Sequence, residues 1–274
     1  MSAANFRLRL LGTGTSSGVP AIGCDCPTCT SDDPRDRRLR TSAAVQFTDH
    51  AGQSRTILID VSPDHREQAL RAGLNRCDGI LLTHSHVDHA FGLDEVRRYN
   101  ALMGTALDLY ADEPTLQDIR RVFRHIFHSD QNQNDSFVAR IVTRPIAPLQ
   151  EFWIHGLQVL PLPLLHGRQE ILGFRLEAPE SGGPLPLGYC TDCSAIPPQS
   201  LAALAGVDTL ILDMLRERSH QTHLTLGQAV ELARSIGARR TVLVHMGHEV
   251  LHRAVVAKLP AGIELGVDGM ELSA

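Results

Sequence analysis

Three histidines and an aspartate crowd into six residues, H-S-H-V-D-H, directly after a short apolar run. The run predicts a buried strand, which places the cluster in the turn at the strand's carboxyl end, where α/β sheets carry chemistry. Neutral imidazoles bind zinc and other first-row ions, and carboxylates bind harder cations. We expect His84 and His86 to bind one ion, and Asp88 and His89, at the start of the following helix, to bind a second.

Two metal ions need more ligands than these four, and the rest of the chain supplies them. Three further apolar, strand-like runs each end in a ligand-type residue: 159–165 before His166, 185–191 before Asp192, and 241–244 before His245. One such run alone is weak evidence. Three of them favour a site that is assembled from side chains at the ends of several strands.

A second cluster, C-D-C-P-T-C, lies near the N-terminus and supplies three thiols, Cys24, Cys26 and Cys29. The chain has 6 cysteines, and with no sign of secretion we expect thiols or metal ligands rather than disulfides. A tetrahedral structural zinc needs a fourth ligand, for which His248, three residues after His245, is the best candidate. Three reduced cysteines in an ordinary loop remain the alternative.

The elements that must position these side chains follow from the hydrophobic pattern. In the first half we expect strands at 6–11, 43–47, 56–60 and 79–83, then helices at 88–103 and 113–128. In the second half we expect strands at 157–165, 171–176, 185–190 and 209–213, and helices at 226–236 and 249–258. Two similar halves with ligands at strand ends predict an α/β fold, an αββα sandwich of two facing sheets with helices outside.

Composition is typical of a globular enzyme. The chain has 274 residues, 43% of them hydrophobic, and no linker divides it, so we expect a single domain over 1–274. The formal net charge of -5 argues against a stable nucleic-acid partner. The chain shows neither a signal peptide nor a membrane-length apolar run, so we expect a cytoplasmic protein with no membrane partner. A homodimer is expected only because dimers are the commonest assembly.

The ordered set H-x-H-x-D-H followed by a distant His, Asp and His resembles the metallo-β-lactamase superfamily of binuclear hydrolases. The resemblance covers nearly the whole chain and implies the same αββα sandwich. It implies one catalytic metal on His84, His86 and His166, a second on Asp88, His89 and His245, and Asp192 as the bridge between them. The implied metal is usually zinc, and sometimes manganese or iron. Because the ligand set is intact, a catalytic member is implied.

With the G-T-G-T turn at 12–15, the cysteine cluster and the H-x-x-H at His245 and His248, the chain also resembles the PhnP branch. Members of that branch are phosphodiesterases that open a ribose 1,2-cyclic phosphate. The branch implies a structural zinc on the three cysteines and His248. It also implies a catalytic role for His223, although the residues alone equally describe a solvated histidine beside a helix cap. Asp88 is the second catalytic candidate.

Phosphodiester hydrolysis is the expected reaction. Two cations would screen the negative phosphate and hold a hydroxide that attacks phosphorus, while His223 protonates the departing sugar oxygen. The expected substrate is a small cyclic phosphodiester, either a phosphoribosyl 1,2-cyclic phosphate or a related nucleotide. Alternatives are a thioester or lactone hydrolase of the same superfamily and an RNA-processing nuclease. A structural zinc protein without catalysis would leave the seven ligands unexplained.

The segment 113–148 is the expected determinant of substrate choice. It combines a helical pattern rich in basic residues, among them Arg120, Arg121, Arg124 and His125, with a polar run. We expect it to cap the substrate, and its arginines could bind a second phosphate. A solvated helix face followed by a loop is the alternative, and the sequence does not favour one over the other.

Overall fold

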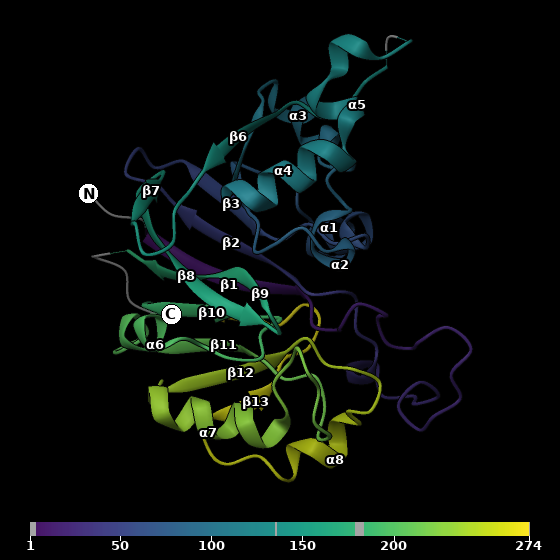
Figure 1. Ribbon diagram of the computed structural model, residues 1–274, viewed down its shortest axis with the longest axis vertical. Helices are drawn as coiled ribbons and strands as arrows, with labels where there is room; N and C mark the ends of the chain where they lie inside the picture. The colour runs from purple at the N-terminus through teal and green to yellow at the C-terminus, as the bar shows by residue number, and fades with distance from the viewer. Residues whose placement is uncertain (1–3, 135, 179–183, 274) are drawn as a thin grey trace.

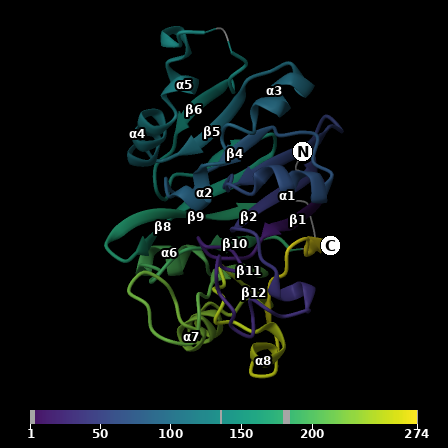
Figure 2. The same cartoon turned by 90° about the vertical axis from the view of Figure 1, so that its right-hand side faces the viewer.

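The computed structural model describes residues 4–134, 136–178 and 184–273. Two seven-stranded sheets form its centre, with the strand orders β14-β1-β2-β3-β4-β5-β6 and β13-β12-β11-β10-β9-β8-β7. The sheets face each other, and helices cover the outer face of each (Figures 1 and 2). This arrangement confirms the predicted αββα sandwich.

Each sheet combines antiparallel strands with a parallel set. The first contains β1 (Ala4–Gly12), β2 (Ser42–Thr48), β3 (Ser54–Ile59), β4 (Gly79–Leu81), β5 (Leu107–Ala111), β6 (Ile141–Pro145) and β14 (Glu271–Ser273). The second contains β7 (Phe152–Ile154), β8 (Leu157–His166), β9 (Gln169–Glu177), β10 (Leu187–Cys190), β11 (Thr209–Asp213), β12 (Arg240–Val244) and β13 (Ile263–Leu265). Strands β3 to β6 are parallel, as are β10 to β13. The loops that follow the strands of each parallel set therefore gather at one edge of its sheet.

The inner faces of the two sheets share one apolar core. Side chains of the first sheet such as Val45 and Ile57 belong to the same buried cluster as Phe174, Tyr189 and Val242 of the second, and all five are fully buried. Burying apolar surface in this way contributes about 25 cal/mol per Å². A well-packed core also fixes the two sheets against each other, so that loops from both can build one site.

Eight α-helices are described on the outer faces. Those of the first sheet are α1 (His65–Ala72), α2 (Val87–Ala90), α3 (Arg97–Met103), α4 (Glu113–Val122) and α5 (Arg124–Phe127). Those of the second are α6 (Pro198–Ala203), α7 (Leu226–Ile236) and α8 (His252–Val256). No helix in the described ranges is long and apolar enough to cross a membrane.

Two helices that the sequence predicted as continuous are broken. The predicted helix 88–103 is interrupted between α2 and α3, where Gly92 packs so closely that a Cβ atom there would lie 2.1 Å from the Ser62 carbonyl oxygen. The predicted helix 113–128 divides at Phe123, whose φ of -96° and ψ of 47° are not helical. The last predicted helix, 249–258, is the shorter α8. Hydrophobic periodicity survives such breaks, which is why it did not reveal them.

Candidate metal centre

All seven predicted catalytic ligands lie together where loops of the two sheets meet. They form two groups, His84, His86, His166 and Asp192, and Asp88, His89, Asp192 and His245, and within each group the ligand atoms lie within 4.8 Å of one another. Asp192 belongs to both groups. The grouping is the one that the resemblance implied, and its spacing suits two neighbouring metal ions.

Asp192 occupies the centre of the cluster. One of its carboxylate oxygens lies 3.0 Å from His84 Nε2 and 3.2 Å from His89 Nε2, and the other lies 3.2 Å from His166 Nδ1. The residue is only 2% exposed and has a φ of 55°, a left-handed conformation that aspartate and asparagine tolerate better than most residues. The turn after β10 therefore presents its carboxylate to histidines from both sheets.

Several buried polar atoms of the cluster have no hydrogen-bond partner among the described residues. They include His84 Nε2, His89 Nε2, His245 Nε2 and Asp192 Oδ1. Leaving a buried polar group unpaired costs about 1–3 kcal/mol. Divalent cations bound by these nitrogen and oxygen lone pairs would remove that cost, so the residues fit the two metals that the family implies.

Two of the predicted ligands, His84 and Asp88, are in the ionisation state that binds metals. Burial, reinforced by neighbouring His89, lowers the pKa of His84 to about 4, which keeps its imidazole neutral at pH 7. Burial favours the neutral form of Asp88, but the imidazoles of His245 and His89, 3.5 and 3.4 Å from one of its oxygens, hold its pKa far below the usual range. Neutral imidazoles and ionised carboxylates are the forms that bind metals.

Asp60 is a part of the centre that the sequence analysis missed. It follows β3, is fully buried, and one of its oxygens lies 2.7 Å from His89 Nδ1. The same carboxylate accepts hydrogen bonds from the backbone N–H and the hydroxyl of Thr83. A carboxylate on the far nitrogen of a metal-binding histidine fixes the orientation of its ring. The sequence does contain a pattern that indicates Asp60: an apolar strand that ends in Asp, the same pattern that identified Asp192.

We expect Asp60→Asn to weaken metal binding without unfolding the protein. Asparagine tolerates the φ of 61° at position 60. It is neutral, however, so it lacks the negative charge that Asp60 places beside His89. Loss of such an orienting carboxylate lowers metal affinity by about 10–100-fold. Titration of the metal-free variant with zinc measures the affinity, and circular dichroism reports the fold. Unchanged zinc affinity would show that Asp60 does not support His89.

Asp213 at the end of β11 is a second buried carboxylate that the sequence analysis missed, although it too closes an apolar strand. One oxygen accepts a hydrogen bond of 2.9 Å from the Leu224 N–H. The other lies 3.4 Å from His223 Nδ1 and 3.6 Å from His245 Nδ1. Asp213 thus faces a predicted ligand and the predicted catalytic histidine together.

His223 lies at the rim of the cluster, as its predicted role requires. It is 9% exposed, and its Nδ1 lies 3.0 Å from Asp192 and 3.4 Å from Asp213. Among the described residues its Nε2 has no partner. The ligand atoms of Asp192, Asp213, His223 and His245 also lie within 4.8 Å of one another, so the geometry allows His223 to act either as a proton donor or as a ligand.

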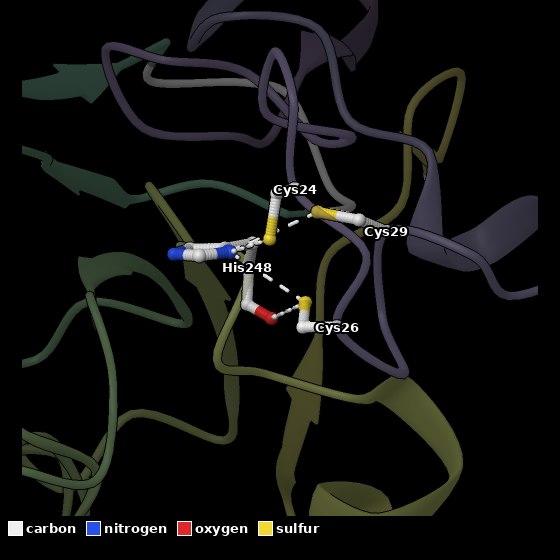
Figure 3. Close-up of side chains that lie close together, drawn as sticks. All are labelled: Cys24, Cys26, Cys29 and His248. Carbon is white, nitrogen blue, oxygen red and sulfur yellow. Dashed lines mark hydrogen bonds between the residues drawn. The ribbon is translucent and has the colours of Figure 1, made fainter.

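A separate cluster joins the predicted structural zinc ligands (Figure 3). His248 Nδ1 lies 3.1 Å from Cys24 Sγ, 3.5 Å from Cys26 Sγ and 3.7 Å from Cys29 Sγ. Tetrahedral zinc bonds of ~2.3 Å to sulfur and ~2.0 Å to nitrogen place such atoms roughly 3.5 Å apart. The four side chains therefore fit a Cys₃His zinc site.

The thiols of this cluster are unequal. Hydrogen bonding to the Cys29 backbone lowers the pKa of Cys26 to about 6, whereas burial raises the pKa of Cys29 to about 11. Cys26 is therefore ready to bind a cation as a thiolate near neutral pH. A zinc ion binds thiolates and would ionise the remaining cysteines as well.

The segment 113–148 forms α4, α5 and the edge strand β6 of the first sheet. Asp118 of α4 accepts a 2.9 Å hydrogen bond from the Ser85 hydroxyl, which places this helix beside the histidine loop. Two of its arginines are already paired with carboxylates on their own helix, Arg120 with Glu113 and Arg121 with Asp118. A capping role for the segment stays a prediction.

The family model "Beta-lactamase superfamily domain" matches residues 55–246, which hold the whole predicted catalytic ligand set. The chain belongs to the metallo-β-lactamase superfamily. It is also 40% identical to a protein solved as "a New Diphosphatase from the PhnP Family", with a TM-score of 0.85 and 97% of each chain covered. The resemblance to the PhnP branch is therefore confirmed, and the protein is a metal-dependent hydrolase of this fold.

Two other relatives carry different names. An octanoyltransferase of Porphyromonas gingivalis is 37% identical over 97% of this chain, but the chain spans only 51% of that relative. The zinc-bound PqqB structure from Methylobacterium extorquens is 24% identical, with a TM-score of 0.76 and 98% of this chain and all of that chain covered, and it supports the fold alone. The name octanoyltransferase describes a protein about twice the length of the matched region.

Proposed function

We propose that the protein hydrolyses a P–O bond of a small phosphodiester, with two divalent metals at the catalytic centre and a zinc ion on the Cys₃His cluster. The observation that carries the proposal is the pair of ligand groups that share Asp192, with His223 beside them. His84, His86 and His166 would bind one metal, while Asp88, His89 and His245 would bind the other. Zinc and manganese are the metals that we propose.

The metals would supply charge screening for the phosphate and a water of lowered pKa. The protein's own residues supply the rest. Buried Asp60 lies against His89, and buried Asp213 faces His245. Asp88, a proposed ligand of the second metal, would also help to hold the attacking water. His223 donates the proton that the leaving oxygen needs, from an Nε2 whose opposite nitrogen faces Asp213.

The substrate we propose is a cyclic phosphodiester, a phosphoribosyl 1,2-cyclic phosphate or a nucleotide-like relative. A diphosphate is the second candidate, because the 40% identical PhnP-family protein is described as a diphosphatase. Both reactions cleave a P–O bond at a charged phosphate, so the same centre suits both. Thiols that bind zinc fit a reducing compartment, which supports the expected cytoplasmic location.

Replacing His223 tests the role of this residue directly. For His223→Ala we expect turnover of a poorly activated substrate such as a 2′,3′-cyclic nucleotide to fall about 10²–10⁴-fold, the usual contribution of a proton donor. Turnover of bis(p-nitrophenyl) phosphate should fall much less, because its leaving group needs no proton. Metal analysis should still find two catalytic ions. Loss of one ion would instead make His223 a ligand.

The reaction class is tested with a substrate panel. The zinc- and manganese-loaded protein is offered bis(p-nitrophenyl) phosphate, 2′,3′-cyclic nucleotides, ribose cyclic phosphates, dinucleotide diphosphates and acyl thioesters, among them an octanoyl thioester. We expect turnover of phosphate esters. Activity confined to thioesters would overturn the proposal and favour acyl chemistry of the kind that the octanoyltransferase name suggests.

A further inference from the structure

Arg168 lies in the turn next to the predicted ligand His166, and its positive charge is not paired with a carboxylate among the described residues. It lies in the turn between β8 and β9, two residues after the predicted ligand His166. Consecutive Cα atoms are ~3.8 Å apart, so the two Cα atoms lie within roughly 7.6 Å. Arg168 is exposed, and among the described residues its guanidinium has no hydrogen-bond or ion-pair partner.

The turn that carries Arg168 is held firmly in place. The Gly167 N–H donates to the Ser194 hydroxyl at 3.0 Å, and His166 Nδ1 lies 3.0 Å from the Thr222 carbonyl oxygen. Gly167 also packs against Thr222, since a Cβ on this glycine would lie 2.8 Å from the Thr222 methyl carbon. The base of the arginine is thus fixed beside the centre, while its long side chain stays free.

The charge of the predicted metal centre indicates a role for the Arg168 guanidinium. Four carboxylates, Asp60, Asp88, Asp192 and Asp213, are buried in or against it. Two divalent cations would bring four positive charges, which these four carboxylates would already match. A phosphodiester brings one negative charge into this centre. A diphosphate diester brings a second charge, which needs another cation outside the ligand cluster.

We infer that Arg168 binds the second phosphate of a diphosphate substrate, an inference that rests on the proposed function. A guanidinium suits this task because its planar N–H groups can bind two phosphate oxygens at once. Arg120 and Arg121, which the sequence made candidates for a second phosphate, are paired with carboxylates of their own helix. We assign the second phosphate to the β8–β9 turn of the second sheet, which carries the predicted ligand His166, rather than to these two arginines.

The test compares Arg168→Gln with the wild type on two probes, diadenosine diphosphate and bis(p-nitrophenyl) phosphate. Loss of a hydrogen-bonded charge costs about 1.5–3 kcal/mol, so KM for the diphosphate should rise roughly 10- to 150-fold. Its kcat should change little, and both constants for the single-phosphate probe should stay within about twofold. Arg234→Gln is the matched control, because Arg234 is exposed on the outer helix α7.

Each outcome separates this inference from the proposed function. Equal losses on both probes, or no change on either, would overturn the role of Arg168 while leaving phosphodiester hydrolysis intact. A wild type that hydrolyses only bis(p-nitrophenyl) phosphate would overturn the diphosphate assignment alone. A wild type inactive on both probes in the presence of metals would overturn the proposed function.

Discussion

Asp192→Asn is expected to remove both catalytic metals and to abolish turnover. Asp192 is the only residue shared by the two predicted ligand groups within the described ranges, and its oxygens lie 3.0–3.2 Å from His84, His89 and His166. An asparagine offers one neutral oxygen in place of a bridging carboxylate. Without the metals, the transition state would lose several kcal/mol of stabilisation. We therefore predict that kcat/KM falls about 10³-fold or more.

Metal analysis and kinetics on the same preparation check this prediction. The fold should survive, because asparagine also tolerates the φ of 55° at this position. Asp208→Asn is the control, since Asp208 lies before β11 and pairs with Arg239 on the surface. Full metal content with undiminished turnover in Asp192→Asn would show that this carboxylate does not bridge two ions.

The second large effect is expected at the zinc cluster. Cys26→Ser should lose the structural zinc and lower the melting temperature by about 10 °C or more. A structural zinc contributes several kcal/mol to folding, and each kcal/mol moves the midpoint of a protein of this size by about 2–4 °C. Differential scanning calorimetry and zinc analysis measure both quantities, and one zinc per chain should disappear.

This substitution should also reduce catalysis, because one loop serves both sites. His245 and His248 are three residues apart, and the Met246 N–H donates to the Thr13 carbonyl oxygen just before the cysteine loop. Asp25→Asn is the control, since Asp25 is exposed between two cysteines of the Cys₃His cluster. A Cys26→Ser variant with unchanged zinc content and melting temperature would contradict the Cys₃His assignment.

Much of the fold and of the ligand set was predictable from the sequence. Long apolar strands such as β8 and β11 were recognised almost to the residue, because burial demands a continuous pattern. The predicted ligands His166 and His245 were recognised by their place at strand ends. Shorter strands such as β7 and β13 were missed, since three residues carry too little periodicity.

The residues behind the ligands were harder to predict. Asp60 and Asp213 close their strands as Asp192 does, yet only the packing of the two sheets shows that they face His89, His223 and His245. The free charge of Arg168 was equally hidden, since sequence cannot show which arginines already have partners. Such information resides in contacts between segments that are distant along the chain.

The central claim is that two metals held by this cluster hydrolyse phosphate esters. It is tested most directly by titrating the metal-free protein with zinc or manganese, after restoring the structural zinc, while hydrolysis of bis(p-nitrophenyl) phosphate is followed. We predict that activity appears only as metal binds and reaches its plateau at two further equivalents per chain. Full activity in the metal-free protein, or two bound equivalents with no hydrolysis of any phosphate ester in the panel, would contradict the account.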